Sequence, residues 1–201
     1  MLRIALAAVL FVVACSACGT SSTTRKEEPS DAGGDSAPVG QCNAVTAQQP
    51  DEGAAHAEEC STLSFLSNPP SSGTHYGVFP AFGVYATELS RGYWVHALEH
   101  GGIVFSYNCG AGCADDIAAA ILFIENLDPE PLCVSSGQLG PRIILTPDSE
   151  LDTRWAASSW GYTLRADCFD PQAFGAFAAE HVGRAPENIC GGTPGLETRC
   201  R

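Results

Sequence analysis

Apolar residues along the chain recur in short blocks that alternate between strand-like and helix-like spacing. Residues 103–107 are β-branched or aromatic at four of five positions, which predicts a buried strand. After the acids Asp115 and Asp116, apolar residues at helical spacing predict a helix, and its face is formed by Ile117, Ala120, Ile121, Ile124 and Leu127. A second main helix is predicted from Pro171, because Asp170 suits an N-cap and proline suits the first helical position.

Shorter elements complete the pattern. Residues 91–100 predict a brief helix that ends at Gly101-Gly102, since glycine commonly follows a helix end. Strands are expected at 82–86, 142–146 and 155–164, the last two paired with each other. A strand, helix, strand, strand, helix order predicts an α+β or small α/β sandwich, with a small sheet and two main helices.

The N-terminus has the pattern of an export signal. Arg3 precedes an apolar run, Ile4–Val13, which is too short to cross a bilayer that needs about 20 residues. Cys15 follows the small residue Ala14 at the expected signal-peptide cleavage site. Residues 1–14 are therefore predicted to be a lipoprotein signal, and Cys15 is predicted to be the lipidated residue. Cys18 is the alternative. The protein is therefore expected to be exported and lipid-anchored, at the bacterial outer membrane or the periplasmic face.

Two further regions follow the signal. Residues 15–41 carry the lipidated cysteine and a Ser/Thr/Gly/Pro segment with almost no large apolar side chain, which predicts a flexible tether. Residues 42–201 have the length of a single globular domain.

This domain contains an even number of cysteines, and export to an oxidising compartment favours four disulfides among them. The eight are Cys42, Cys60, Cys109, Cys113, Cys133, Cys168, Cys190 and Cys200. Pairing of Cys42 with Cys60 and of Cys190 with Cys200 is expected from proximity in the chain. Cys109 and Cys113 lie between a predicted strand and helix, where they could bond to each other, or one of them to Cys133.

The net charge of −13 disfavours a nucleic-acid role, because phosphates require a basic surface, and no nucleic-acid partner is expected. Removing residues 1–14 takes away only Arg3 and leaves −14. The same acidity disfavours electrostatic adhesion to anionic lipid, so the lipid is the expected membrane contact and a protein partner stays unknown.

The histidines are the strongest chemical candidates. His96 and His100 are four residues apart on one predicted helical face, and His75 follows a rigid proline turn. Together they predict a metal site for zinc or copper(II), with Glu99 as a ligand or as a partner of the ligands and His56 as a further ligand.

Three alternatives remain open. The His96–His100 segment also fits the inverted zinc-protease pattern, in which Glu99 would activate water in a metal-dependent hydrolase, although a non-catalytic role is favoured. Cys109 and Cys113 would support a thiol redox or copper-chaperone-like protein. A non-metal interaction module would use its histidines only for folding.

Several segments resemble one bacterial family. The runs Asn68–Tyr76, Gly83–Tyr85 and His96–Gly102, together with His56, Tyr107, Trp160-Gly161 and Ala185-Pro186-Glu187, are similar to domain-of-unknown-function family 3105. The resemblance spans roughly residues 54–187, and Ser71 and Ala97 depart from its usual threonine and asparagine. It implies a cell-envelope protein without an established activity, and it implies that His75, His96, Glu99 and His100 form a shared site.

Overall fold

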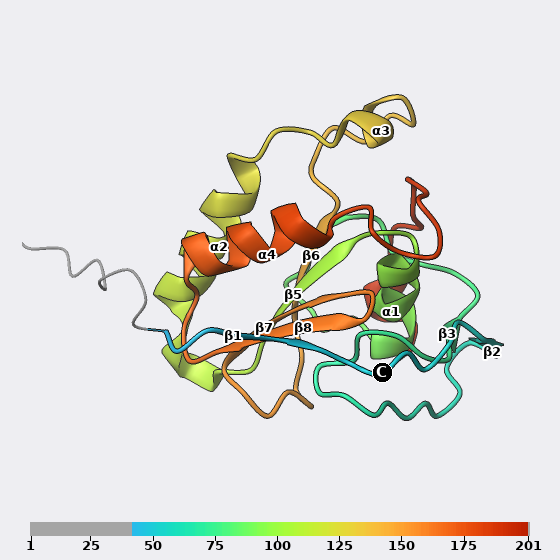
Figure 1. Cartoon of the computed structure of the whole chain (residues 1–201), viewed down its shortest axis with the longest axis horizontal. Coiled ribbons are helices and arrows are strands. Elements are labelled where there is room, and N and C mark those ends of the chain that lie inside the picture. The colour runs from blue at the N-terminus through green and yellow to red at the C-terminus, as the bar shows by residue number, and fades with distance from the viewer. Residues whose placement is uncertain (1–41, 201) are drawn as a thin grey trace, which may run out of the picture. The chain divides into compact units, whose positions relative to one another are not determined.

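The computed structural model describes residues 42–200 (Figure 1). The predicted signal peptide, both candidate lipidation sites and the whole of the predicted tether lie outside these residues. In chain order the elements are β1 (Val45–Gln48), β2 (His56–Ala57), β3 (His75–Tyr76), β4 (Gly83–Val84), α1 (Arg91–Glu99), β5 (Ile103–Tyr107), α2 (Ala114–Glu125), α3 (Pro131–Val134), β6 (Ile143–Pro147), β7 (Trp155–Ser159), β8 (Tyr162–Ala166) and α4 (Pro171–His181). Two short 3₁₀ helices occupy Gly110–Gly112 and Leu196–Thr198.

A mixed six-stranded sheet forms the centre, in the order β1-β8-β7-β5-β6-β4. Side chains of β5 and β6 alternate between its two faces. Ile103 and Phe105 pack with Ile124 of α2 and Phe174 of α4 in one core. Val104, from the same strand, belongs to a second core, which contains Trp94 and Leu98 of α1 and Ile144 of β6. The sheet therefore lies between α2 and α4 on one face and α1 on the other (Figure 1).

The fold confirms the predicted α+β class, and most predicted elements are present. The strand at residues 103–107, a helix that ends at Glu99 just before Gly101-Gly102, and the Asp170 cap are all found, and Asp170 accepts hydrogen bonds from the backbone N–H groups of Gln172 and Ala173. The single strand expected at 155–164 is wrong: it is a hairpin that turns at Gly161 in the left-handed region. Its first strand, β7, pairs with β5 and not with β6.

Four disulfides join the eight cysteines of the domain, as expected, but with different partners. Both pairings expected from chain proximity are wrong. The bonds are Cys42–Cys168, Cys60–Cys200, Cys109–Cys113 and Cys133–Cys190. Two of them join residues 126 and 140 positions apart, so they connect the beginning of the described chain to its C-terminal half. Cys133 pairs with Cys190, which excludes the alternative bond from Cys109 or Cys113 to Cys133.

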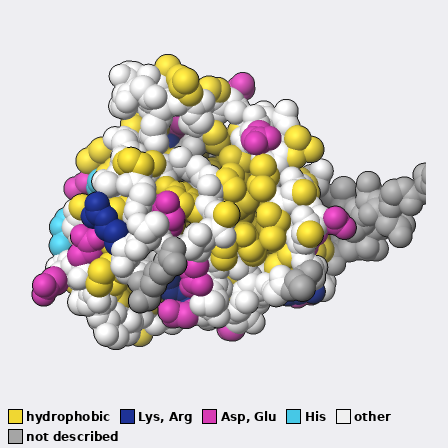
Figure 2. Space-filling view, turned by 180° about the vertical axis from the view of Figure 1, so that it is seen from behind, with side chains coloured by type: hydrophobic (Ala, Val, Ile, Leu, Met, Phe, Trp, Pro, Cys, Tyr) yellow, Lys and Arg dark blue, Asp and Glu magenta, His cyan; other side chains and the backbone are white. Residues whose placement is uncertain are grey.

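Among residues 42–200, no helix has both the length and the apolar character needed to cross a membrane. The rear of the domain carries a broad area of hydrophobic side chains bordered by polar residues (Figure 2). Helices α2 and α4 also contribute apolar walls to a cavity of about 440 Å³, with Phe123, Leu127 and Val182 among its lining residues.

Candidate metal site

Four side chains predicted from the sequence to bind metal converge in the structure. His56, His75, His96 and Glu99 each offer one ligand atom, and these atoms all lie within 4.8 Å of one another. We call these four residues the inner cluster. His75, His96 and Glu99 are buried, whereas His56 is exposed, so the cluster reaches the surface at one residue. The sequence analysis named His56 only as a possible additional ligand. In the structure, its imidazole lies within the same group of ligand atoms as His75, His96 and Glu99.

Two very short strands bring His56 and His75 together. Strands β2 and β3 pair in parallel, and their register sets His56 directly beside His75. Their ring centroids are 4.9 Å apart. The proline turn before β3 is attached to the β7–β8 hairpin, because Gly161 at the hairpin tip donates its N–H to the carbonyl of Ser71. The hairpin, the proline turn and β3 therefore position His75 as one unit.

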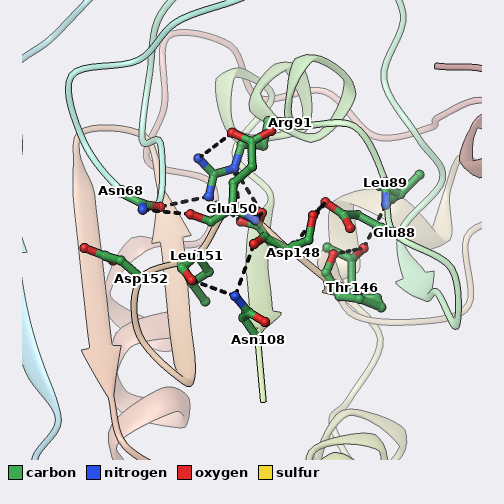
Figure 3. A network of polar contacts seen from close by, with 12 residues as sticks. Asn68, Glu88, Leu89, Arg91, Asn108, Thr146, Asp148, Glu150, Leu151 and Asp152 are labelled. Carbon is green, nitrogen blue, oxygen red and sulfur yellow. Dashed lines mark hydrogen bonds and ion pairs between the residues drawn. The ribbon is translucent and has the colours of Figure 1, made fainter. Parts of the chain in front are cut away.

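Helix α1 supplies the opposite side of the cluster. His96 and Glu99 are three residues apart, so both point from one helical face. The helix is anchored at its start by Arg91, whose guanidinium contacts buried Asp148 at 2.8 Å and the Asn68 side chain at 2.8 Å (Figure 3). This network ties the first turn of α1 to the end of β6 and to the proline turn. It fixes the helix relative to the segment that carries His75.

Backbone carbonyls define which nitrogen carries hydrogen in the two buried histidines of the inner cluster. Nδ1 of His75 lies 2.8 Å from the carbonyl oxygen of Gly73, and Nδ1 of His96 lies 2.7 Å from that of Tyr76. A carbonyl oxygen only accepts, so both Nδ1 atoms donate. In each neutral ring, Nε2 therefore carries a lone pair that points into the cluster. Histidine ligands of metals are typically held in this way.

These lone pairs face other acceptors. Nε2 of His75 lies 3.1 Å from Oε2 of Glu99, and Nε2 of His96 lies 3.8 Å from the same oxygen. Two acceptors at such a separation repel each other unless a proton or a cation lies between them. Ligands bound tetrahedrally at 2.0–2.1 Å from an ion are themselves roughly 3.3 Å apart. The cluster therefore has the spacing and the polarity of a cation site.

Burial favours the metal-binding form of the histidines, although it disfavours the ionised form of Glu99. It lowers the pKa of His75, and it lowers the pKa of His96 to about 4. The pKa of His100 is lowered by burial and by the neighbouring His96, and burial together with the nearby Glu187 raises the pKa of Glu99. The three imidazoles are consequently neutral near pH 7, which is the form that binds a metal ion.

His100 was expected to complete a three-histidine site with His75 and His96. In the structure, it contacts His96 on one side and Glu187 on the other. Its Nε2 lies 3.1 Å from Nε2 of His96 and 3.0 Å from Oε2 of Glu187. We call His100 and Glu187 the outer pair. Phe79 packs edge-on against the His100 ring, with 4.3 Å between centroids, and covers this side of α1.

Glu187 was not predicted as a site residue. It comes from the irregular segment after α4, where no helical or strand spacing indicates which side chains turn inward. Its backbone N–H donates to the carbonyl of Glu99 at 3.0 Å, which attaches the segment to the end of α1. The only signal available in the sequence was its place in the Ala185-Pro186-Glu187 run, within the family resemblance.

The cysteines lie in other environments. Cys109 and Cys113 are bonded to each other, with 5.7 Å between their α-carbons, at the start of α2. Two groups that combine a glutamate with a cysteine pair also have ligand-like spacing, Glu59 with Cys60 and Cys200, and Glu130 with Cys133 and Cys190. Their cysteines form disulfides and offer no thiolate, which is the form of cysteine that binds metal. The histidine cluster is therefore the better candidate for a metal site among the described residues.

Comparison with known proteins gives one match. The model of a family described as "Protein of unknown function (DUF3105)" matches residues 56–192, more than half of the 201-residue chain. The matched region begins at His56 and ends after Glu187, so it contains the inner cluster and the outer pair. No curated protein and no solved structure matches the chain.

Proposed function

The chain belongs to the DUF3105 family, whose function is unknown, and we propose that its domain binds a divalent transition-metal ion through the inner cluster. One observation carries the proposal. His75 and His96 both use Nδ1 to donate to backbone carbonyls, which leaves two buried Nε2 lone pairs directed at a buried carboxylate. Without a cation this arrangement costs free energy, because the buried Nε2 of His75 is left without a hydrogen-bond donor.

The donor set narrows the choice of metal. Three imidazoles and one carboxylate suit zinc and copper(II), since imidazole is a ligand of intermediate softness. The only methionine is Met1, so the domain has no thioether for copper(I). Because the domain is expected to lie outside the cytoplasm, we propose that it binds zinc or copper(II) in the cell envelope.

Metal content is the direct test of the proposal. Protein purified without a histidine tag should hold at least one zinc or copper ion per chain by elemental analysis. The double variant His75→Ala, His96→Ala should lose that metal. His181→Ala is the matched control, because His181 is buried in α4 against Tyr162 and lies outside the cluster, and it should retain the metal.

A second variant guards against misfolding. His56 is exposed, so His56→Ala should leave the fold intact and weaken binding at least about 10-fold, as even residues around a metal site do. Wild-type protein without stoichiometric metal would contradict the proposal. So would a His75→Ala, His96→Ala variant that binds metal as tightly as the wild type.

We also propose that the chain is exported and anchored by lipid at Cys15, with Cys18 as the alternative. The support is the N-terminal sequence pattern alone. Mass spectrometry of the N-terminal peptide from membrane fractions should show a diacylated cysteine at the start of the mature chain. An unmodified peptide that contains both cysteines would refute the anchor.

A further inference from the structure

The inner cluster and the outer pair together supply more ligands than one tetrahedral ion takes. Zinc ions bind four protein ligands in structural sites and three in catalytic sites. The inner cluster alone already offers four, and two ligating groups remain beside it. We propose that the site holds two metal ions, the second bound at the outer pair; this rests on the proposed binding of metal by the inner cluster.

The spacing of the outer atoms supports a second ion. Nε2 of His100 lies 3.0 Å from Oε2 of Glu187 and 3.1 Å from Nε2 of His96. Both separations are close to the roughly 3.3 Å expected between two ligands of one tetrahedral ion. His100 therefore has a suitable co-ligand on each side, one from its own helix and one from the segment after α4.

His96 lies between the two positions, and one lone pair on Nε2 binds only one ion. Its Nε2 is nearer to His100 than to Glu99, at 3.1 Å and 3.8 Å. When both ions are bound, His96 therefore joins the outer pair. Each ion then receives two imidazoles and one carboxylate. The inner set is His56, His75 and Glu99, and the outer set is His96, His100 and Glu187.

Glu187 is held in place although half of its side chain is exposed. Its backbone N–H bonds to the carbonyl of Glu99, and the neighbouring Asn188 accepts a hydrogen bond from the buried guanidinium of Arg142 at 2.6 Å. Arg142 also donates to the carbonyl of His100 at 3.1 Å. One arginine thus ties the backbone of His100 to the segment that carries Glu187, which keeps the outer pair together.

Two ions held in this way would leave coordination positions open. Each set contributes three ligands and a single negative charge, so each divalent ion keeps positive charge and room for further ligands. Two-metal sites place their ions about 3.5–4 Å apart and bind oxygen ligands between them. The ligand class that fits is water or an anionic oxygen group, such as a carboxylate or a phosphate.

Titration of the metal-free full-length chain with Zn²⁺ tests the second ion. Isothermal calorimetry should give two equivalents for the wild type. Glu187→Gln should weaken the second equivalent by about 10–100-fold or more and leave the first in place. Glu187 is exposed enough that its substitution should not disturb folding, and Glu180→Gln, an exposed acid on α4, should keep both equivalents.

Copper(II) provides an independent readout, because two ions a few ångströms apart couple magnetically. Electron paramagnetic resonance of protein loaded with two equivalents of Cu²⁺ should show a coupled spectrum, and Glu187→Gln should restore a mononuclear one. One bound equivalent in the wild type, or two uncoupled ions, would overturn the second site and leave the proposed function standing. No bound metal at all would instead overturn the proposed function.

Discussion

Replacing Glu99 with glutamine should stabilise the metal-free protein while weakening its metal binding. The Glu99 carboxylate is buried and faces Nε2 of His75 at 3.1 Å, acceptor against acceptor, and burial raises its pKa. A glutamine amide of nearly the same shape can donate to that nitrogen and carries no charge. A hydrogen bond of this kind contributes about 0.5–1.5 kcal/mol. For a chain of this size, 1 kcal/mol corresponds to a rise of about 2–4 °C in the melting temperature.

Differential scanning calorimetry with and without a chelator at pH 7 measures both effects. In chelator, Glu99→Gln should melt about 2–4 °C above the wild type. With zinc at about 100 times its dissociation constant, the wild type should gain about 2.7 kcal/mol, and the variant much less. Glu125→Gln, an exposed acid on α2, is the matched control and should change neither value. A Glu99→Gln variant that melts below the wild type in chelator would refute the reasoning, because Glu99 would then stabilise the metal-free fold.

Two further predictions concern packing and pH. Gly92→Ala should lower the unfolding free energy measured by urea denaturation by about 1–3 kcal/mol, because the new Cβ would lie 2.5 Å from the Tyr76 ring. The same clash should move β3 away from α1 and so weaken metal binding. Unchanged stability would contradict this prediction. Burial lowers the pKa of His181, with Glu180 and Arg184 as its charged neighbours, so the unfolded state binds the proton more tightly. The unfolding free energy should therefore fall as the pH drops below about 6.5, and less steeply in His181→Gln; equal slopes would contradict this.

Local spacing predicted the part of the site that lies on one helix. His96, Glu99 and His100 are three and four positions apart, and a helix places such residues on one face whatever surrounds it. His56 and His75 are neighbours only because β2 pairs with β3. Each of these strands is two residues long, so neither has enough residues to show an alternating pattern. Their pairing depends on the tertiary structure, which is why His56 was a weaker prediction than the helical residues.

The disulfide pairings failed for a related reason. Proximity in the sequence favoured Cys42 with Cys60, yet both cysteines bond to residues more than 120 positions away. Strand β1 brings Cys42 to its partner, because β1 lies antiparallel to β8, just before Cys168.

The hairpin error was avoidable, since Gly161 follows Trp160 in the middle of the predicted strand, and a glycine at such a place indicates a turn.

The polar face of α1 is the strongest argument that the histidines do more than support the fold. Every residue from Gly92 to Glu99 is buried, although His96 and Glu99 would normally point to solvent. Strands β2 and β3 cover that face and add His75 to it, and Phe79 covers His100. A purely structural helix would be more stable with apolar residues at these positions, because buried polar groups without donors are costly. Positions where a sequence gives up local stability in this way are typically functional, and the donor-less Nε2 beside this face belongs to His75, a candidate metal ligand.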